Sequence, residues 1–134
     1  VMWIGRLLAK LMPRAGMLAL DGSGVSRDAE VVAAYEADPL VNHGKVTAGL
    51  GIALFDAMDR VMTEAGSITL PMLIMHGGAD TLAAPIGSET FATKVGATDF
   101  TLKVLPGLYH EIFNEPEGEE IIGQYADWIE ARLP

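Results

Sequence analysis

The stretch LPMLIMHGGADTL, residues 70–82, decides the fold of this 134-residue chain. Its first six residues are almost all apolar and show no polar alternation, which is typical of a strand buried on both faces of a parallel sheet. Gly77 and Gly78 end this strand, because glycine lets the backbone turn sharply. Asp80 is therefore expected at the carboxyl end of the strand.

A second strand is predicted at residues 100–105, where apolar positions alternate as they do near the edge of a sheet. Residues 85–95, which start with a proline and are followed by a glycine, predict a helix between the two strands. A connection of this length allows a right-handed crossover, so the strands are expected to be parallel neighbours. Asp80 and His110 then leave the same edge of the sheet, where open α/β sheets hold their ligands.

Asp80 and His110 form the candidate catalytic pair. A carboxylate that hydrogen-bonds an imidazole fixes the ring tautomer and stabilises the protonated ring, as a general base for a serine requires. The order acid then histidine, after consecutive strands, is that of the α/β-hydrolase triad. Alone, Asp80 would be a helix-capping residue and His110 a loop histidine, but their matching positions favour the pair. His76 is interpreted as structural, and a zinc site built from these three side chains is the disfavoured alternative.

The sequence segments around these residues resemble segments of a known family. LPMLIMHGGADTL and LKVLPGLYHEIFNEP, residues 102–116, resemble the acid and histidine loops of monoacylglycerol lipases and related lysophospholipases and serine hydrolases. AYEADPLVNHGKVTAGLGIALFDAMDRV, residues 34–61, resembles their cap and the helix that returns to the core. The resemblance covers almost the whole chain.

This resemblance implies an α/β fold: the carboxyl-terminal part of an α/β-hydrolase, with its last parallel strands, their flanking helices and an incomplete sheet. It divides the chain into a helical cap with its returning helix, residues 1–64, and a core that carries the two loops, residues 65–134. It also implies that Asp80 and His110 are the catalytic acid and base. By the same resemblance, Leu54, Phe55 and Leu82 contact the substrate.

The family's nucleophile is missing from this sequence. In the resembling proteins a serine lies in a G-x-S-x-G turn before the cap. None of the four serines here has glycines at that spacing; they are Ser23, Ser26, Ser67 and Ser88. The strand that leads into that turn and the oxyanion loop are also not evident. We therefore expect a carboxyl-terminal portion that begins inside the cap and does not catalyse by itself.

The implied function is that of a serine ester hydrolase for monoacylglycerols or similar single-chain lipid esters, with no cofactor and no metal. One alternative is another α/β-hydrolase, such as a lysophospholipase, a peptidase or an epoxide hydrolase with an aspartate nucleophile. The other alternative is an inactive truncated or proteolytic product that persists by association. Its expected partner is the missing amino-terminal part of the same hydrolase or a second copy, because two strands cannot cover their own edges.

Composition excludes several function classes. The net charge of -9 disfavours nucleic-acid binding, which requires a basic patch. The absence of cysteine excludes disulfides and thiolate chemistry. No apolar span of eighteen residues and no signal peptide is evident, so we expect a soluble protein, with the cytoplasm as the favoured compartment and transient membrane-surface contact through the cap as the alternative.

The remaining segments complete the expected organisation. Residues 1–12 predict an apolar helix that packs on two sides and, by the resemblance, lines the path of the acyl chain. Residues 14–27 predict a mobile loop, because they carry three glycines and no sustained period. Further helices are predicted at residues 28–36, 45–64 and 116–133. The last has a predicted buried stripe, which consists of Ile121, Ile122, Tyr125, Trp128, Ile129 and Leu133. His43 is interpreted as a surface or capping residue.

Overall fold

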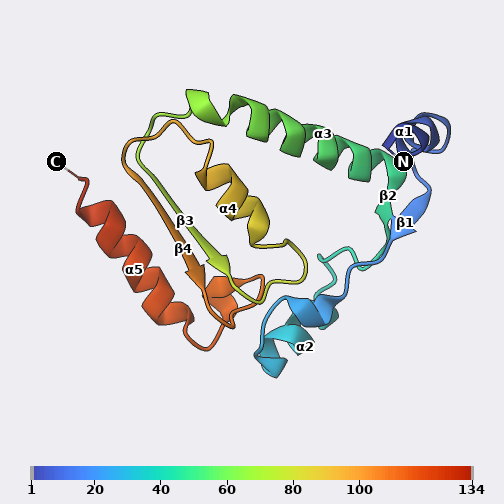
Figure 1. Cartoon of the computed structure of the whole chain (residues 1–134). Helices are drawn as coiled ribbons and strands as arrows, with labels where there is room; N and C mark the ends of the chain where they lie inside the picture. The colour runs from blue at the N-terminus through green and yellow to red at the C-terminus, as the bar shows by residue number, and fades with distance from the viewer. Residues whose placement is uncertain (1, 134) are drawn as a thin grey trace.

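The computed structural model describes residues 2–133 and divides into an α/β part and a helical part (Figure 1). The α/β part contains two strands and two helices, which are β3 (Met72–Gly77), α4 (Ile86–Ala92), β4 (Phe100–Leu105) and α5 (Gly118–Glu130). The helical part contains α1 (Met2–Leu11), β1 (Gly16–Leu18), α2 (Ala29–Ala37), β2 (Val46–Thr47) and α3 (Ala48–Glu64). Short 3-10 turns lie at η1 (Gly22–Gly24), η2 (Ala65–Ser67) and η3 (Ile112–Asn114).

Strands β3 and β4 pair in parallel, from Met72 opposite Phe100 to Gly77 opposite Leu105. Helix α4 forms the crossover between them, and α4 and α5 flank the strand pair on opposite sides (Figure 1). The predicted arrangement of adjacent parallel strands with flanking helices is therefore confirmed. Both strands point their carboxyl ends toward the same edge, which is where the two candidate catalytic loops begin.

The core of the α/β part lies between the strand pair and α5. Its buried members are Met75, Leu108, Ile112 and Ile121. The predicted buried stripe of α5 is only partly correct, because Ile122, Ile129 and Leu133 are exposed. Helix α5 contacts the sheet through one narrow face, which fits a two-stranded sheet that offers little surface to cover.

The helical part differs from expectation at residues 14–27. A mobile loop was predicted there, but the segment contains β1 and η1, and Val25 and Ser26 are each only 2 % exposed. β1 pairs antiparallel with β2, which lies about thirty residues later in the chain. A strand of three residues has no readable period, so its pairing depends on that distant partner.

Helix ends also shift by a few residues. α3 begins at Ala48 and not at residue 45, because the hydroxyl of Thr47 caps it by accepting a hydrogen bond from the Leu50 N–H. α4 ends at Ala92 and α5 begins at Gly118, so both are shorter than predicted. In residues 2–133, no helix combines the length and apolarity that crossing a bilayer requires.

Gly77 lies tightly against the loop that carries His110. A Cβ atom at Gly77 would overlap the carbonyl oxygens of Leu108 and Tyr109. We expect Gly77→Ala to displace this loop and to lower the free energy of unfolding by about 1–3 kcal/mol, the usual cost of overpacking. Urea unfolding measures this change. The control is Gly87→Ala in α4, where a Cβ meets no atom within 4 Å. If both variants unfold at the wild-type urea concentration, the loop does not lie this close.

Candidate active site

Asp80 lies in the tight turn that follows β3. Backbone hydrogen bonds connect this turn to the loop after β4. The N–H groups of Gly78 and Ala79 donate to the carbonyl oxygens of Leu105 and Leu108 at 2.7 and 2.9 Å. The Asp80 side chain is 2 % exposed. Its Oδ1 accepts hydrogen bonds from the N–H groups of Leu82 and Ala83 at 2.8 and 2.9 Å. Asp80 therefore orders its own loop before α4 and still has a second carboxylate oxygen available.

The second oxygen of Asp80 binds the ring of His110. The distance from His110 Nδ1 to Asp80 Oδ2 is 2.8 Å. Because an ionised carboxylate only accepts, Nδ1 donates, and the neutral ring carries its proton there. His110 Nε2 hydrogen-bonds no other residue within 2–133, and the side chain is 43 % exposed. The structure thus brings the two predicted catalytic residues together and leaves His110 Nε2 without a hydrogen-bond partner in residues 2–133.

The surroundings of Asp80 favour the ionised form of its carboxyl group. Burial, the largest single influence, raises the pKa of Asp80. The hydrogen bonds from Ala83, from the His110 ring and from Leu82, together with the positive charge of protonated His110, lower it by more. The net result is a pKa of Asp80 below its usual value, as a group that stabilises an imidazolium requires.

His76 supports this loop from the other side. Its Nε2 lies 2.8 Å from the carbonyl oxygen of Ala83 and 3.2 Å from Asp80 Oδ2. Its Nδ1 lies 2.7 Å from Oγ of Ser88, in α4. A carbonyl only accepts, so Nε2 carries the proton and, in the neutral ring, Nδ1 accepts from the Ser88 hydroxyl. The prediction of a structural His76 that bonds across the loop is confirmed.

The part of the chain that the structure describes offers His110 no serine partner. Ser26 donates to the carbonyl oxygen of Asn114 at 2.9 Å, and Ser67 donates to that of Glu64 at 2.7 Å. Ser88 contacts His76. Within residues 2–133, no group of three histidine, aspartate or glutamate side chains is arranged to hold a metal ion.

The three predicted substrate-contacting residues lie in two places. Leu82 is half-buried in the Asp80 loop. Leu54 and Phe55 are exposed on α3, which runs across the top of Figure 1, away from the carboxyl ends of β3 and β4. Phe55 lines an apolar cavity of about 200 Å³ between α1, β1 and α3, together with Leu8 and Ile52. The structure therefore brings Leu82 alone to Asp80.

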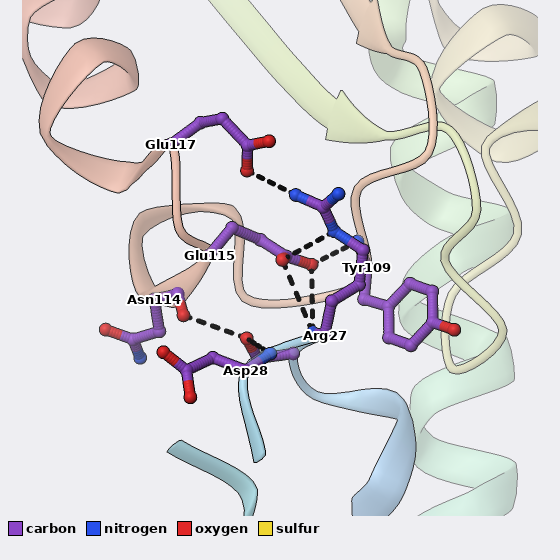
Figure 2. A network of polar contacts seen from close by, with 7 residues as sticks. Arg27, Asp28, Tyr109, Asn114, Glu115 and Glu117 are labelled. Atoms are coloured by element: carbon purple, nitrogen blue, oxygen red, sulfur yellow. Dashed lines mark hydrogen bonds and ion pairs between the residues drawn. The ribbon is translucent and has the colours of Figure 1, made fainter. Parts of the chain in front are cut away.

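The sequence interpretation missed an ion pair between Arg27 and the buried carboxylate of Glu115. The distance from Arg27 Nε to Glu115 Oε2 is 2.9 Å, and the Glu115 side chain has no exposed surface. Figure 2 shows Arg27 between the carboxylates of Glu115 and Glu117. No local signal could have revealed this pair, because 88 residues separate its members.

Comparison with known proteins gives matches over most of the chain. The family model for serine aminopeptidase S33 matches residues 1–117. The chain is 43 % identical over 130 residues to a monoacylglycerol lipase of Mycolicibacterium smegmatis, covering 97 % of this chain and 46 % of that protein. It is 32 % identical over 130 residues to a monoglyceride lipase of Rattus norvegicus, covering 96 % and 43 %.

A solved structure agrees with these matches. The crystal structure of a Paleococcus ferrophilus monoacylglycerol lipase superposes with a TM-score of 0.85 at 33 % identity, covering 94 % of this chain and 49 % of that one. The chain thus spans about half the length of the relatives it matches. Its parallel strands and flanking helices form part of an α/β-hydrolase fold. The chain belongs to the serine aminopeptidase S33 family of α/β-hydrolases and is similar there to the monoacylglycerol lipases.

Proposed function

We propose that this chain supplies the acid and the base of a Ser-Asp-His triad in an ester hydrolase for monoacylglycerols or similar single-chain esters. The observation that carries the proposal is the 2.8 Å hydrogen bond from His110 Nδ1 to the buried Asp80 Oδ2. The named lipases among its relatives support the substrate class. The serine comes from outside these 134 residues, because none of the four serines lies in a G-x-S-x-G turn.

The proposed reaction proceeds through an acyl-enzyme. His110 Nε2 takes the proton of the serine hydroxyl as the oxygen attacks the ester carbonyl carbon. The imidazolium then gives that proton to the leaving glycerol oxygen, and the ester bond breaks. A water molecule then attacks the acyl-enzyme while His110 takes its proton, and His110 returns that proton to the serine oxygen as the acyl–serine bond breaks and the fatty acid leaves. Asp80 stays ionised throughout and stabilises the imidazolium.

The two parts of the chain take different roles in this proposal. Residues 1–64 act as a cap whose α3 residues, Leu54 and Phe55, contact the acyl chain when the cap covers the site. Leu82 contacts it next to the catalytic acid. The apolar cavity beside Phe55 supports this assignment, because a fatty acyl chain requires such a lining.

The experiment compares this chain with a chimera. The chimera joins the chain to the part of the Mycolicibacterium smegmatis lipase that lies outside the aligned segment. We expect no hydrolysis of a medium-chain monoacylglycerol and no fluorophosphonate labelling for the chain alone, and both for the chimera. Labelling of the chain alone that disappears in Ser88→Ala would contradict the proposal, because the nucleophile would then lie within the chain. A folded chimera without hydrolysis would also contradict it.

A second candidate is that the chain by itself is non-catalytic and persists through association. The observation that favours this candidate is the exposure of large apolar side chains on α1 and α3, with Trp3 and Leu11 each 69 % exposed. Size-exclusion chromatography with light scattering tests it. A dimer or a bound second polypeptide would support this candidate, and a stable monomer of the chain mass would contradict it.

A further inference from the structure

The loop that carries His110 is clamped along its length by a segment from the other part of the chain, residues 24–28. The N–H of Glu111 donates to the carbonyl oxygen of Val25 at 2.8 Å. The N–H of His110 lies 3.4 Å from the carbonyl oxygen of Gly24. The hydroxyl of Ser26 donates to the carbonyl oxygen of Asn114 at 2.9 Å. These contacts hold the backbone of the loop at His110 and at residues that follow it.

Glu115 lies between the histidine loop and residues 24–28, with its carboxylate fully buried. Its Oε1 accepts from the backbone N–H of Tyr109 at 2.6 Å, and its Oε2 accepts from Arg27 Nε at 2.9 Å (Figure 2). The backbone N–H of Arg27 reaches both oxygens at 3.3 to 3.4 Å. A buried carboxylate is costly without its partners, so Glu115 strongly disfavours any movement of Arg27 or Tyr109.

Residues 27 and 28 also connect the histidine loop to two helices. The guanidinium of Arg27 also pairs with Glu117, directly before α5. The next residue, Asp28, caps α2 by accepting from the N–H of Glu30 at 2.8 Å. The hydrogen bond to Glu115 raises the pKa of Arg27 above its usual value, so this cation persists at every working pH.

Tyr109 is the link to the catalytic pair. It directly precedes His110, so the carboxylate of Glu115 holds the peptide next to the Cα atom of the base. The bond from His110 Nδ1 to Asp80 is directional at 2.8 Å, and a small displacement of the loop would break it. Glu115 does not touch His110 itself and acts on it through the backbone.

We propose that Glu115 and Arg27 are positioning residues, and that their ion pair couples the docking of residues 24–28 to the formation of the Asp80–His110 hydrogen bond. The inference rests on the proposed function, because it assigns the pair a role in orienting the base. Its test, however, requires neither the serine nor turnover. The readout is the downfield proton signal of the hydrogen-bonded imidazole, measured by NMR on the full 134-residue chain.

The chain contains three histidines, so each ring signal can be assigned by substitution. We expect Glu115→Gln, which keeps the shape and an oxygen for Tyr109 but removes the charge, to lose or greatly weaken the Nδ1–H signal of His110. Arg27→Gln should have the same effect. The Nε2–H signal of His76, which donates to the Ala83 carbonyl, should persist in both variants and so report an intact fold.

The matched control is Asp99→Asn. Asp99 pairs with Arg132 through two contacts of 2.7 Å, at the start of β4 and far along the sheet from His110. This variant also removes the carboxylate partner of an arginine, and both imidazole signals should remain. An unchanged His110 signal in Glu115→Gln would overturn the inference. Loss of the His76 and His110 signals together would also overturn it, because the ion pair would then stabilise the fold in general.

Activity gives a separate readout in the chimera. We expect Glu115→Gln to lower kcat about 10–100-fold with little change in KM, as a misplaced catalytic group does. Asp99→Asn should leave both constants unchanged. If the chain shows the His110 signal and its loss in Glu115→Gln but the chimera does not hydrolyse esters, the proposed function fails and the positioning role stands.

Discussion

Replacing His110 by alanine in the chimera is expected to lower kcat for monoacylglycerol hydrolysis by about 10⁵–10⁶-fold, the usual loss when a triad base is removed. Within residues 2–133, no other side chain both hydrogen-bonds Asp80 Oδ2 and keeps a ring nitrogen free of protein partners. His76 cannot replace it, because its Nε2 donates to the Ala83 carbonyl and its Nδ1 is occupied by Ser88. Steady-state kinetics measure the change.

The control for this experiment is His43→Ala. His43 is an exposed histidine 3.6 Å from Glu36 in the cap segment, and its removal should leave kcat within a factor of two. KM should change little in His110→Ala, because the imidazole acts on the proton and not on the acyl chain. A His110→Ala chimera that retains more than a tenth of the activity would show that another group is the base.

Replacing Asp80 by asparagine is expected to lower kcat about 10⁴-fold, since the loss of charge and of an acceptor leaves the imidazole in the wrong tautomer. Oδ1 could still accept from the Leu82 and Ala83 N–H groups in this variant. The amide would then present its NH₂ group to His110, which reverses the direction of that hydrogen bond. The kinetic measurement is the same as for His110.

The pH dependence of stability checks the same residue independently. The pKa of folded Asp80 lies below its usual value, so its ionised form stabilises the fold above the unfolded pKa of about 3.9. This contribution should disappear as the pH falls through the lowered folded pKa. The difference in unfolding free energy between wild type and Asp80→Asn should therefore be constant at neutral pH and shrink below pH 4.

The control for Asp80→Asn is Asp59→Asn on the exposed surface of α3. This variant also removes one aspartate, and it should leave kcat unchanged because Asp59 lies outside the proposed site. Equal losses in the two variants would mean that net charge, and not the orientation of His110, controls the rate. An Asp80→Asn chimera with wild-type kcat would contradict the role of Asp80 as the triad acid.

Local sequence patterns were sufficient for the α/β part. The apolar run before Gly77 and the alternation at residues 100–105 predicted β3 and β4, and both are present and parallel. The order of acid and histidine after these strands predicted the contact between Asp80 and His110. These predictions succeed because strand period, glycine turns and crossover geometry act over short stretches of chain.

Contacts between distant segments could not be predicted in this way. Residues 14–27 were expected to be mobile, but residues 24–26 lie buried against the histidine loop. Glu117 pairs with Arg27, which lies 90 residues earlier in the chain. Each of these outcomes depends on a partner about ninety residues away, which no local period or propensity encodes.

The chain's own residues thus specify the two strands, the helix between them and the two loops that carry a carboxylate and an imidazole. Only the folded arrangement decides that Arg27, in a glycine-rich segment with no period of its own, pairs with a buried Glu115 beside the base. The physical reason is that a strand or a turn forms from interactions within a few residues. The ion pair of a buried carboxylate, in contrast, forms only where packing brings together two segments that are distant in the sequence.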